Sequence, residues 1–171
     1  KWGIREMTYL KHKYLHPVVD RKKFLGTFPN SYGKKSLQPK IILKGLNLLD
    51  ACLDKDGIVI PGKTTLIIAS SDIQKLKFLL AILNSKLPLF YIKEKYPASS
   101  YNQGTTFTKE MIDNLPVPEV SEAKKKQLVD IVDKIISMGV GRTEDQKRAI
   151  EKYEKQIDEI LMELYGLSPE E

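Results

Sequence analysis

Residues 57–64 carry the letters of a phosphate-binding loop, which are a glycine, four further residues and then Gly-Lys-Thr. A loop of this kind follows a buried strand and opens a helix, because backbone N–H groups and the helix N-terminus bind the phosphates. Here the charged run 54–56 precedes the glycine, and β-formers follow the threonine. We therefore interpret 57–60 and 64–69 as two strands joined by a Pro61-Gly62 turn, and we expect no nucleotide to bind here.

Two histidines and two acid-x-Lys triplets are the remaining candidates for metal binding or catalysis. His12 and His16 have the spacing of two ligands on one helical face, but no acidic or Cys partner stands at ligand spacing. We expect them to be surface histidines. A metal-dependent nuclease needs its acid-x-Lys triplet on a strand. The triplets 122–124 and 145–147 instead begin amphipathic helices, where acidic residues favour the helix dipole.

No methyltransferase machinery is visible in the sequence. The chain lacks an Asn/Asp-Pro-Pro-aromatic motif, with which amino-methyltransferases hold a flipped adenine, and it lacks a glycine-rich loop for S-adenosylmethionine. We therefore expect this chain to have no catalytic residue, no metal and no cofactor of its own.

The size and composition are those of one globular domain with a small helical appendage. The chain has 171 residues, of which 42% are hydrophobic and 29% charged. No apolar run approaches the ~18 residues of a membrane helix, so no membrane partner is expected. The first residues are Lys1-Trp2 rather than an initiator Met, and we expect the chain to be a fragment of a longer protein. The lone Cys52 cannot form an internal disulfide and suits a reducing cytoplasm, where we place the protein.

Basic charge is concentrated near the N-terminus. The formal net charge is +6; residues 1–48 carry eleven Lys or Arg against two acids, whereas residues 119–171 carry nine against thirteen. The N-terminal cations alternate with aromatic residues, as expected where a protein neutralises phosphates and touches sugars or bases. The alternative is a solvated basic surface without a partner. The residues concerned are Lys11, Lys13, Arg21, Lys22, Lys23, Lys34, Lys35, Lys40 and Lys44, with Tyr9, Tyr14, Phe24, Phe28 and Tyr32.

The elements that must position these residues begin with short strands. Proline and glycine interrupt the first forty residues so often that we expect loops with short strands or turns there. A short strand over 40–43 follows Pro39, and residues 46–53 fit either a bulged strand or one helical turn. Residues 105–107 are expected to form an edge strand.

Two helices are expected after the central strands, and a third shortly after them. The capping box 71–74 opens an apolar helix that ends at Asn84, and Ser85 caps a second short helix that Pro97 stops. After a polar loop, Thr108 is expected to cap a further helical piece, and the Pro116-Val117-Pro118 segment forms a rigid exit.

The last third of the chain has heptad spacing. Apolar residues recur at intervals of three and four over 128–138 and again over 150–164, with a capping box at Thr143 and a C-terminal glycine, Gly166. Each run is too short for an independent coiled coil. We therefore expect a helical hairpin braced against the globular part.

Five apolar segments carry a family resemblance, and they are Pro39 to Gly45, Gly57 to Ile68, Leu80 to Tyr91, Ile112 to Pro118 and Ile157 to Leu167. They occur in the order seen in TaqI-like C-terminal specificity domains, which the chain resembles over residues 39–167. This family belongs to N6-adenine DNA methyltransferases and to single-chain restriction enzymes that fuse nuclease, methyltransferase and recognition domains. The Leu-Asn-Ser and Leu-Pro-Val-Pro elements also resemble type I specificity subunits.

The resemblance implies a target recognition domain that faces the major groove of double-stranded DNA, while an upstream domain of the same polypeptide flips and methylates the adenine. We expect an α+β fold, with a small mixed or antiparallel sheet and packed helices over 1–118. A helical hairpin over 119–171 then packs on it or on the parent enzyme. The parent is expected to be a type II adenine methyltransferase or restriction endonuclease, to which S-adenosylmethionine, and Mg²⁺ where a nuclease is fused, belong.

The base-reading residues must lie between the five segments, because the segments themselves are apolar. Amide side chains pair with adenine edges, and Lys or Arg pairs with guanine or phosphate. The predicted DNA-binding residues are Arg21, Lys22, Lys23, Asn30, Tyr32, Lys34 and Lys35, with Ser99, Ser100, Tyr101, Asn102 and Gln103 in the polar loop. The competing hypothesis is a protein-interaction module that docks a partner through the heptad seam of 119–171.

Overall fold

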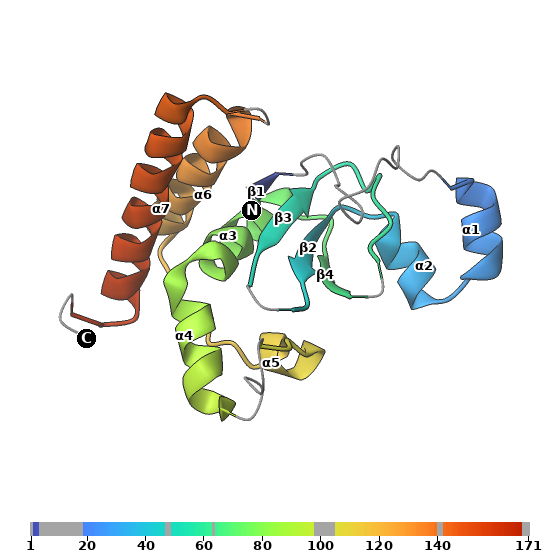
Figure 1. Cartoon of the computed structure of the whole chain (residues 1–171), viewed down its shortest axis with the longest axis horizontal. Coiled ribbons are helices and arrows are strands. Elements are labelled where there is room, and N and C mark those ends of the chain that lie inside the picture. The colour runs from blue at the N-terminus through green and yellow to red at the C-terminus, as the bar shows by residue number, and fades with distance from the viewer. Residues whose placement is uncertain are drawn as a thin grey trace.

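The computed structural model describes residues 2–3, 19–46, 49–62, 64–97, 105–139 and 142–168. These residues form an α+β fold in which a small sheet and a pair of C-terminal helices lie on either side of one central helix (Figure 1). None of the described helices is long and apolar enough to cross a membrane.

The sheet has the strand order β1-β3-β2-β4 and mixed pairing. Strand β2 (Lys40–Lys44) runs antiparallel to both β3 (Ala51–Asp54) and β4 (Thr65–Ala69), while the two-residue β1 (Trp2–Gly3) is parallel to β3. Ile41 and Leu43 alternate along β2 and are fully buried, as the period of a strand requires.

Helix α3 (Ile73–Asn84) is the centre of the core. It contacts β2 and β3 on one side and the C-terminal helices α6 (Glu122–Ser137) and α7 (Glu144–Leu164) on the other. Buried side chains therefore occur all around α3, and Leu76 and Leu80 are completely inaccessible. The hydrophobic core runs without a break from the sheet into the hairpin of α6 and α7.

Asn84 fastens the end of α3 to the sheet. Its amide oxygen accepts the Ala51 N–H at 2.9 Å, and its amide nitrogen donates to the Ala51 carbonyl at 3.0 Å. The described residues of β1 pair with Cys52 and Leu53, and the Asn84 side chain satisfies both backbone groups of the preceding residue, Ala51. This contact explains the asparagine of the Leu-Asn-Ser element.

The hairpin forms as the heptads and caps predict. The Thr143 and Gln146 capping box is present, and Gly166 ends α7 with φ of 68°. The N–H groups of Gly166 and Leu167 donate to the carbonyls of Glu163 and Met162, which is a Schellman motif. Helix α4 (Lys86–Lys95) follows α3 and contacts α7, and the short helix α5 (Lys109–Asp113) begins at its Thr108 cap.

The fold class is confirmed, but the sequence-based outline is wrong in two places. Residues 21–36, expected to be loops, strands or turns, contain the helices α1 (Arg21–Thr27) and α2 (Ser31–Ser36). Residues 57–60, expected to be a strand, form a loop, because the Asp54 carboxylate accepts the N–H groups of Ile58 and Val59. These two N–H groups are therefore not available for hydrogen bonds to a neighbouring strand.

Three smaller corrections concern element ends. The N-cap of α3 is Asp72 rather than Ser71, and its carboxylate accepts the Lys75 N–H. The Ser85 side chain does not cap α4; the first N–H of that helix donates to Asp158 in α7 instead. Residues 105–107 contribute only an isolated bridge, between Thr106 and Leu46.

Candidate nucleic-acid interface

Helices α1 and α2 lie at the end of the sheet opposite the hairpin (Figure 1). Three aromatic rings hold the pair together. The ring of Phe24 lies 5.2 Å from that of Phe28 and 6.2 Å from that of Tyr32, and the last two rings are 5.8 Å apart. Phe28 and Tyr32 keep 41% and 39% of their surface exposed, so the cluster also presents aromatic area to solvent.

The turn between the two helices depends on close packing of the backbone. Asp20 caps α1 and Asn30 caps α2 through their side-chain oxygens. Gly33 is buried, and a Cβ added there would lie 1.8 Å from the Phe28 carbonyl oxygen. Only glycine allows the helices to approach this closely.

Five cations project from these helices into solvent. Arg21, Lys22 and Lys23 begin α1, and Lys34 and Lys35 lie in the last turn of α2, where positive charge is favourable. Within the part of the chain that the structure describes, none of the five forms an ion pair, although the hairpin lysines 126, 147 and 155 all do. Between Val19 and Leu46 the only acidic residue is Asp20. Within residues 19–46, positive charge therefore clearly exceeds negative charge.

Asn30 and Tyr32, two of the predicted DNA-binding residues, use their side chains for hydrogen bonds within the chain. The Asn30 side-chain oxygen accepts the N–H groups of Tyr32 and Gly33, and the Tyr32 hydroxyl donates to the Pro61 carbonyl at 2.9 Å. The Asn30 amide nitrogen and the exposed part of the Tyr32 ring are the groups left to face a ligand.

The loop from Lys55 to Gly62 lies beside α1 and α2 and is fixed to them. Arg21 donates to the Gly57 carbonyl at 3.3 Å, and Tyr32 donates to the Pro61 carbonyl further along the loop. Gly57 has φ of 62°, and a Cβ there would lie 2.5 Å from the Leu37 carbonyl oxygen. The loop is thus held by backbone contacts along its length.

A buried ion pair supports the loop from below. Lys40 Nζ lies 2.5 Å from Asp54 Oδ2, and the side chains are 0% and 1% exposed. The same ammonium donates to the Ser36 carbonyl at 2.8 Å, while Asp54 also accepts from the loop N–H groups. The pair therefore joins the end of α2 to the loop. Lys40, grouped above with the surface cations, faces the interior instead.

Sequence reasoning missed Ile58, which lies in this loop and is 67% exposed. Other exposed apolar or aromatic side chains on α1 and α2 or next to them in the sequence are those of Val19, Leu25, Phe28 and Tyr32. Its aliphatic neighbours in the sequence made it look like part of a strand. Its place in a loop depends on the Asp54 hydrogen bonds to Ile58 and Val59, which no pattern in the sequence indicates.

The sequence motifs considered for nucleotide binding and nuclease chemistry have other roles in the described structure. Strand β4, not a helix, follows residues 57–64, which excludes the fold of a phosphate-binding loop; Lys63 itself lies outside the described residues. The described part of the chain contains no cluster of metal-ligating side chains. The triplets 122–124 and 145–147 lie at the starts of α6 and α7, where Lys124 pairs with Glu163 and Lys147 with Glu144.

Several predicted residues fall where the structure says nothing. Ser99, Ser100, Tyr101, Asn102 and Gln103, the second group of predicted base readers, lie outside the described residues. So do His12 and His16, the two candidates for metal binding.

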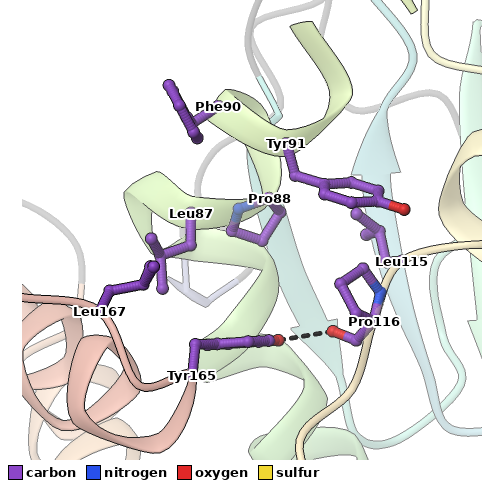
Figure 2. A pocket seen from close by; sticks show the side chains of 8 residues that line it. All are labelled: Leu87, Pro88, Phe90, Tyr91, Leu115, Pro116, Tyr165 and Leu167. Atoms are coloured by element: carbon purple, nitrogen blue, oxygen red, sulfur yellow. Dashed lines mark hydrogen bonds between the residues drawn. The ribbon is translucent and has the colours of Figure 1, made fainter. Parts of the chain in front are cut away.

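A second surface feature is an apolar groove of about 250 Å³ between α4, residues 115–116 and the end of α7 (Figure 2). The Tyr165 hydroxyl points across it and donates to the Pro116 carbonyl at 2.5 Å. Burial raises the pKa of this phenol. The contact ties the end of the hairpin to the segment that leads into it.

The chain was compared with models of protein families and with curated proteins. The family model of the TaqI-like C-terminal specificity domain matches residues 7–117, which is more than half of the chain and includes α1, α2 and the whole of the 55–62 loop. Among curated proteins no relative matches.

Proposed function

Because the chain belongs to the family of TaqI-like C-terminal specificity domains, we propose that it recognises double-stranded DNA through α1, α2 and the 55–62 loop. The observation that carries the proposal is the group of five exposed cations without ion pairs among the described residues. Phosphate neutralisation supplies most of the affinity of a DNA-binding surface. Exposed aromatic and aliphatic side chains between the cations supply contacts to sugars and bases.

The recognition part extends over 1–118, and residues 119–171 brace it. Bases are read by the α1–α2 surface together with Ser99 to Gln103, whose amides and hydroxyls suit adenine edges. This chain is the non-catalytic part of its parent enzyme, which we propose to be an N6-adenine DNA methyltransferase of a type II restriction-modification system, with or without a fused nuclease. S-adenosylmethionine, and Mg²⁺ for cleavage, bind the upstream domain, and the whole enzyme works in the cytoplasm.

The protein-interaction hypothesis loses its docking surface in this fold. Leu128, Ile131 and Ile135 of α6 and Ile150 and Ile157 of α7 are buried in the core of the chain itself. A partner could reach that seam only by unpacking the hairpin from α3.

The test compares two sets of lysine changes with equal charge. One variant replaces Lys22, Lys23, Lys34 and Lys35 by Ala; the control replaces Lys126, Lys147, Lys152 and Lys155, exposed on the hairpin, by Ala. Binding to a pool of random duplexes is measured by fluorescence anisotropy from low to high salt. The first variant should bind about tenfold or more weakly, with a salt slope lower by roughly one for each lysine that contacts a phosphate.

The control variant should bind as the unchanged chain does. Equal weakening by both variants would mean that net charge, not this surface, attracts DNA. Binding of the unchanged chain that does not respond to salt would exclude the proposal altogether.

A further inference from the structure

Ile58 is the most exposed large hydrophobic residue of the described chain, with 67% of its surface accessible. Isolated exposed hydrophobic side chains are common and need no explanation by themselves. This one differs because the chain fixes its position. The Ile58 N–H donates to Asp54 Oδ1 at 3.1 Å, and Asp54 is itself buried against Lys40.

The residues on either side of Ile58 are fixed as well. The Gly57 carbonyl accepts from Arg21, the Val59 N–H donates to Asp54 at 2.9 Å, and the Pro61 carbonyl accepts from Tyr32. Isoleucine is also β-branched, which restricts its first side-chain torsion. An exposed apolar group is therefore presented at a defined place, and little conformational entropy remains to be lost when it makes a contact.

The charges around this loop indicate what it contacts. The guanidinium of Arg21 hydrogen-bonds the loop directly, and four further unpaired cations lie on the same two helices among the described residues. A polyanion is attracted to such a surface, and Ile58 then meets whatever apolar group that polyanion carries. In duplex DNA, the apolar group offered at a base edge is the C5 methyl of thymine, in the major groove.

We propose that Ile58 is a specificity-determining residue that reads thymine through its methyl group. The inference rests on the proposed function, since it requires DNA on the α1–α2 surface. An aliphatic side chain neither donates nor accepts hydrogen bonds, so the polar edges of the other bases offer it nothing. Discrimination comes from burying one methyl group against Ile58, which corresponds to about a fourfold change in affinity.

The experiment pairs a change in the protein with the same contact removed from the DNA. A preferred duplex is first selected from a random pool by the full chain, and each thymine in it is then replaced singly by deoxyuridine, which lacks only the methyl. Dissociation constants are measured for the unchanged chain, for Ile58→Ala, for Ile58→Val, and for Val117→Ala as a control. Val117 is 50% exposed and lies beyond the α1–α2 surface, just before α6.

For the unchanged chain, the methyl group of one thymine should contribute to DNA affinity. For Ile58→Ala, no thymine methyl group should contribute. Replacing that thymine should weaken binding about fourfold; Ile58→Ala should weaken the thymine duplex to the same extent and show no further loss with deoxyuridine. Ile58→Val should keep most of the discrimination, and Val117→Ala all of it. Thermal melting checks that the folds are equal, as expected for a solvent-exposed side chain.

The outcomes separate this inference from the function beneath it. Salt-dependent binding by the unchanged chain, with no thymine whose methyl matters, overturns the role of Ile58 and leaves DNA recognition standing. A loss in Ile58→Ala that is equal on thymine and deoxyuridine duplexes also overturns it, and indicates a wedge between base pairs. Failure of the unchanged chain to bind any duplex overturns both.

Discussion

Replacing Lys40 by Met removes the buried charge beneath the 55–62 loop and keeps most of the side-chain volume. The native ammonium donates to Asp54 and to the Ser36 carbonyl, and neither side chain of the ion pair is more than 1% exposed. The substitution leaves the Asp54 carboxylate buried without a cation. Breaking a buried pair on one side costs about 3–5 kcal/mol, far more than the pair itself contributes, because the remaining charge has lost its compensation.

The lower end of that range applies here. The N–H groups of Ile58 and Val59 still donate to Asp54 in the variant, so the carboxylate keeps two of its hydrogen bonds. We expect the free energy of unfolding to fall by about 3 kcal/mol, against roughly 5–15 kcal/mol for a whole domain. At about 2–4 °C per kcal/mol for a chain of this size, the Tm should fall by about 6–12 °C.

Urea unfolding measures this loss, with the fluorescence of Trp2 as the reporter, since Trp2 is the only tryptophan and is 1% exposed. Lys44→Met is the matched control, because Lys44 lies on the same strand and is exposed; it should change stability by less than about 0.5 kcal/mol. Lys40→Met combined with Asp54→Asn removes the stranded charge and keeps an acceptor oxygen, so it should recover about half of the loss. A single variant within about 1 kcal/mol of the native chain, or a double variant no better than the single one, would refute the reasoning.

Three further predictions concern single residues. Asn84→Asp should lower the free energy of unfolding by about 2–3 kcal/mol in chemical denaturation, because a carboxylate cannot donate to the Ala51 carbonyl, whereas an unchanged stability would show that the contact is dispensable. Gly33→Ala should reduce DNA affinity, because the added Cβ displaces α2 from the Phe28 carbonyl. The Tm should stay within about 4 °C, because this position is remote from the main core, and a large fall in Tm would contradict the prediction. Cys52 should react with a thiol reagent more slowly in the native chain than in urea at pH 8, because burial raises its pKa and so lowers its thiolate fraction; equal rates would contradict the assignment.

The parts of the fold that the sequence predicted are those with long local patterns. The heptads over 128–138 and 150–164 repeat often enough to define one face of a helix, so the hairpin and its caps could be found without tertiary information. Helices α1 and α2 have only seven and six residues, too few for a periodic signal. Gly33 counted as a helix breaker there, although the structure needs it for close packing.

The candidate surface was predicted by composition but not in detail. The sequence identified Arg21, Lys22, Lys23, Lys34 and Lys35 as exposed cations. A charged side chain is expected at the surface from its type alone, without knowledge of its tertiary contacts. The internal position of Lys40 depends on Asp54, fourteen residues away in the sequence. That pairing arises from the register of β2 against β3, which sets the two residues opposite each other. The fixed position of Ile58 follows from the same register and was equally out of reach.

The aromatic cluster of α1 and α2 has a consequence for how this chain could change over evolution. Phe24 is buried within that cluster, but among the described residues no side chain of α1 or α2 belongs to the continuous core around α3. Substitutions or whole-segment exchanges between Asp20 and Ser36 therefore leave the main core untouched, provided that the contacts to Gly57 and Pro61 and the Ser36 carbonyl that accepts from Lys40 are kept. The scaffold can remain constant while the surface it carries diverges, and a lineage or an engineer can acquire a new target by recombination at the two ends of this segment.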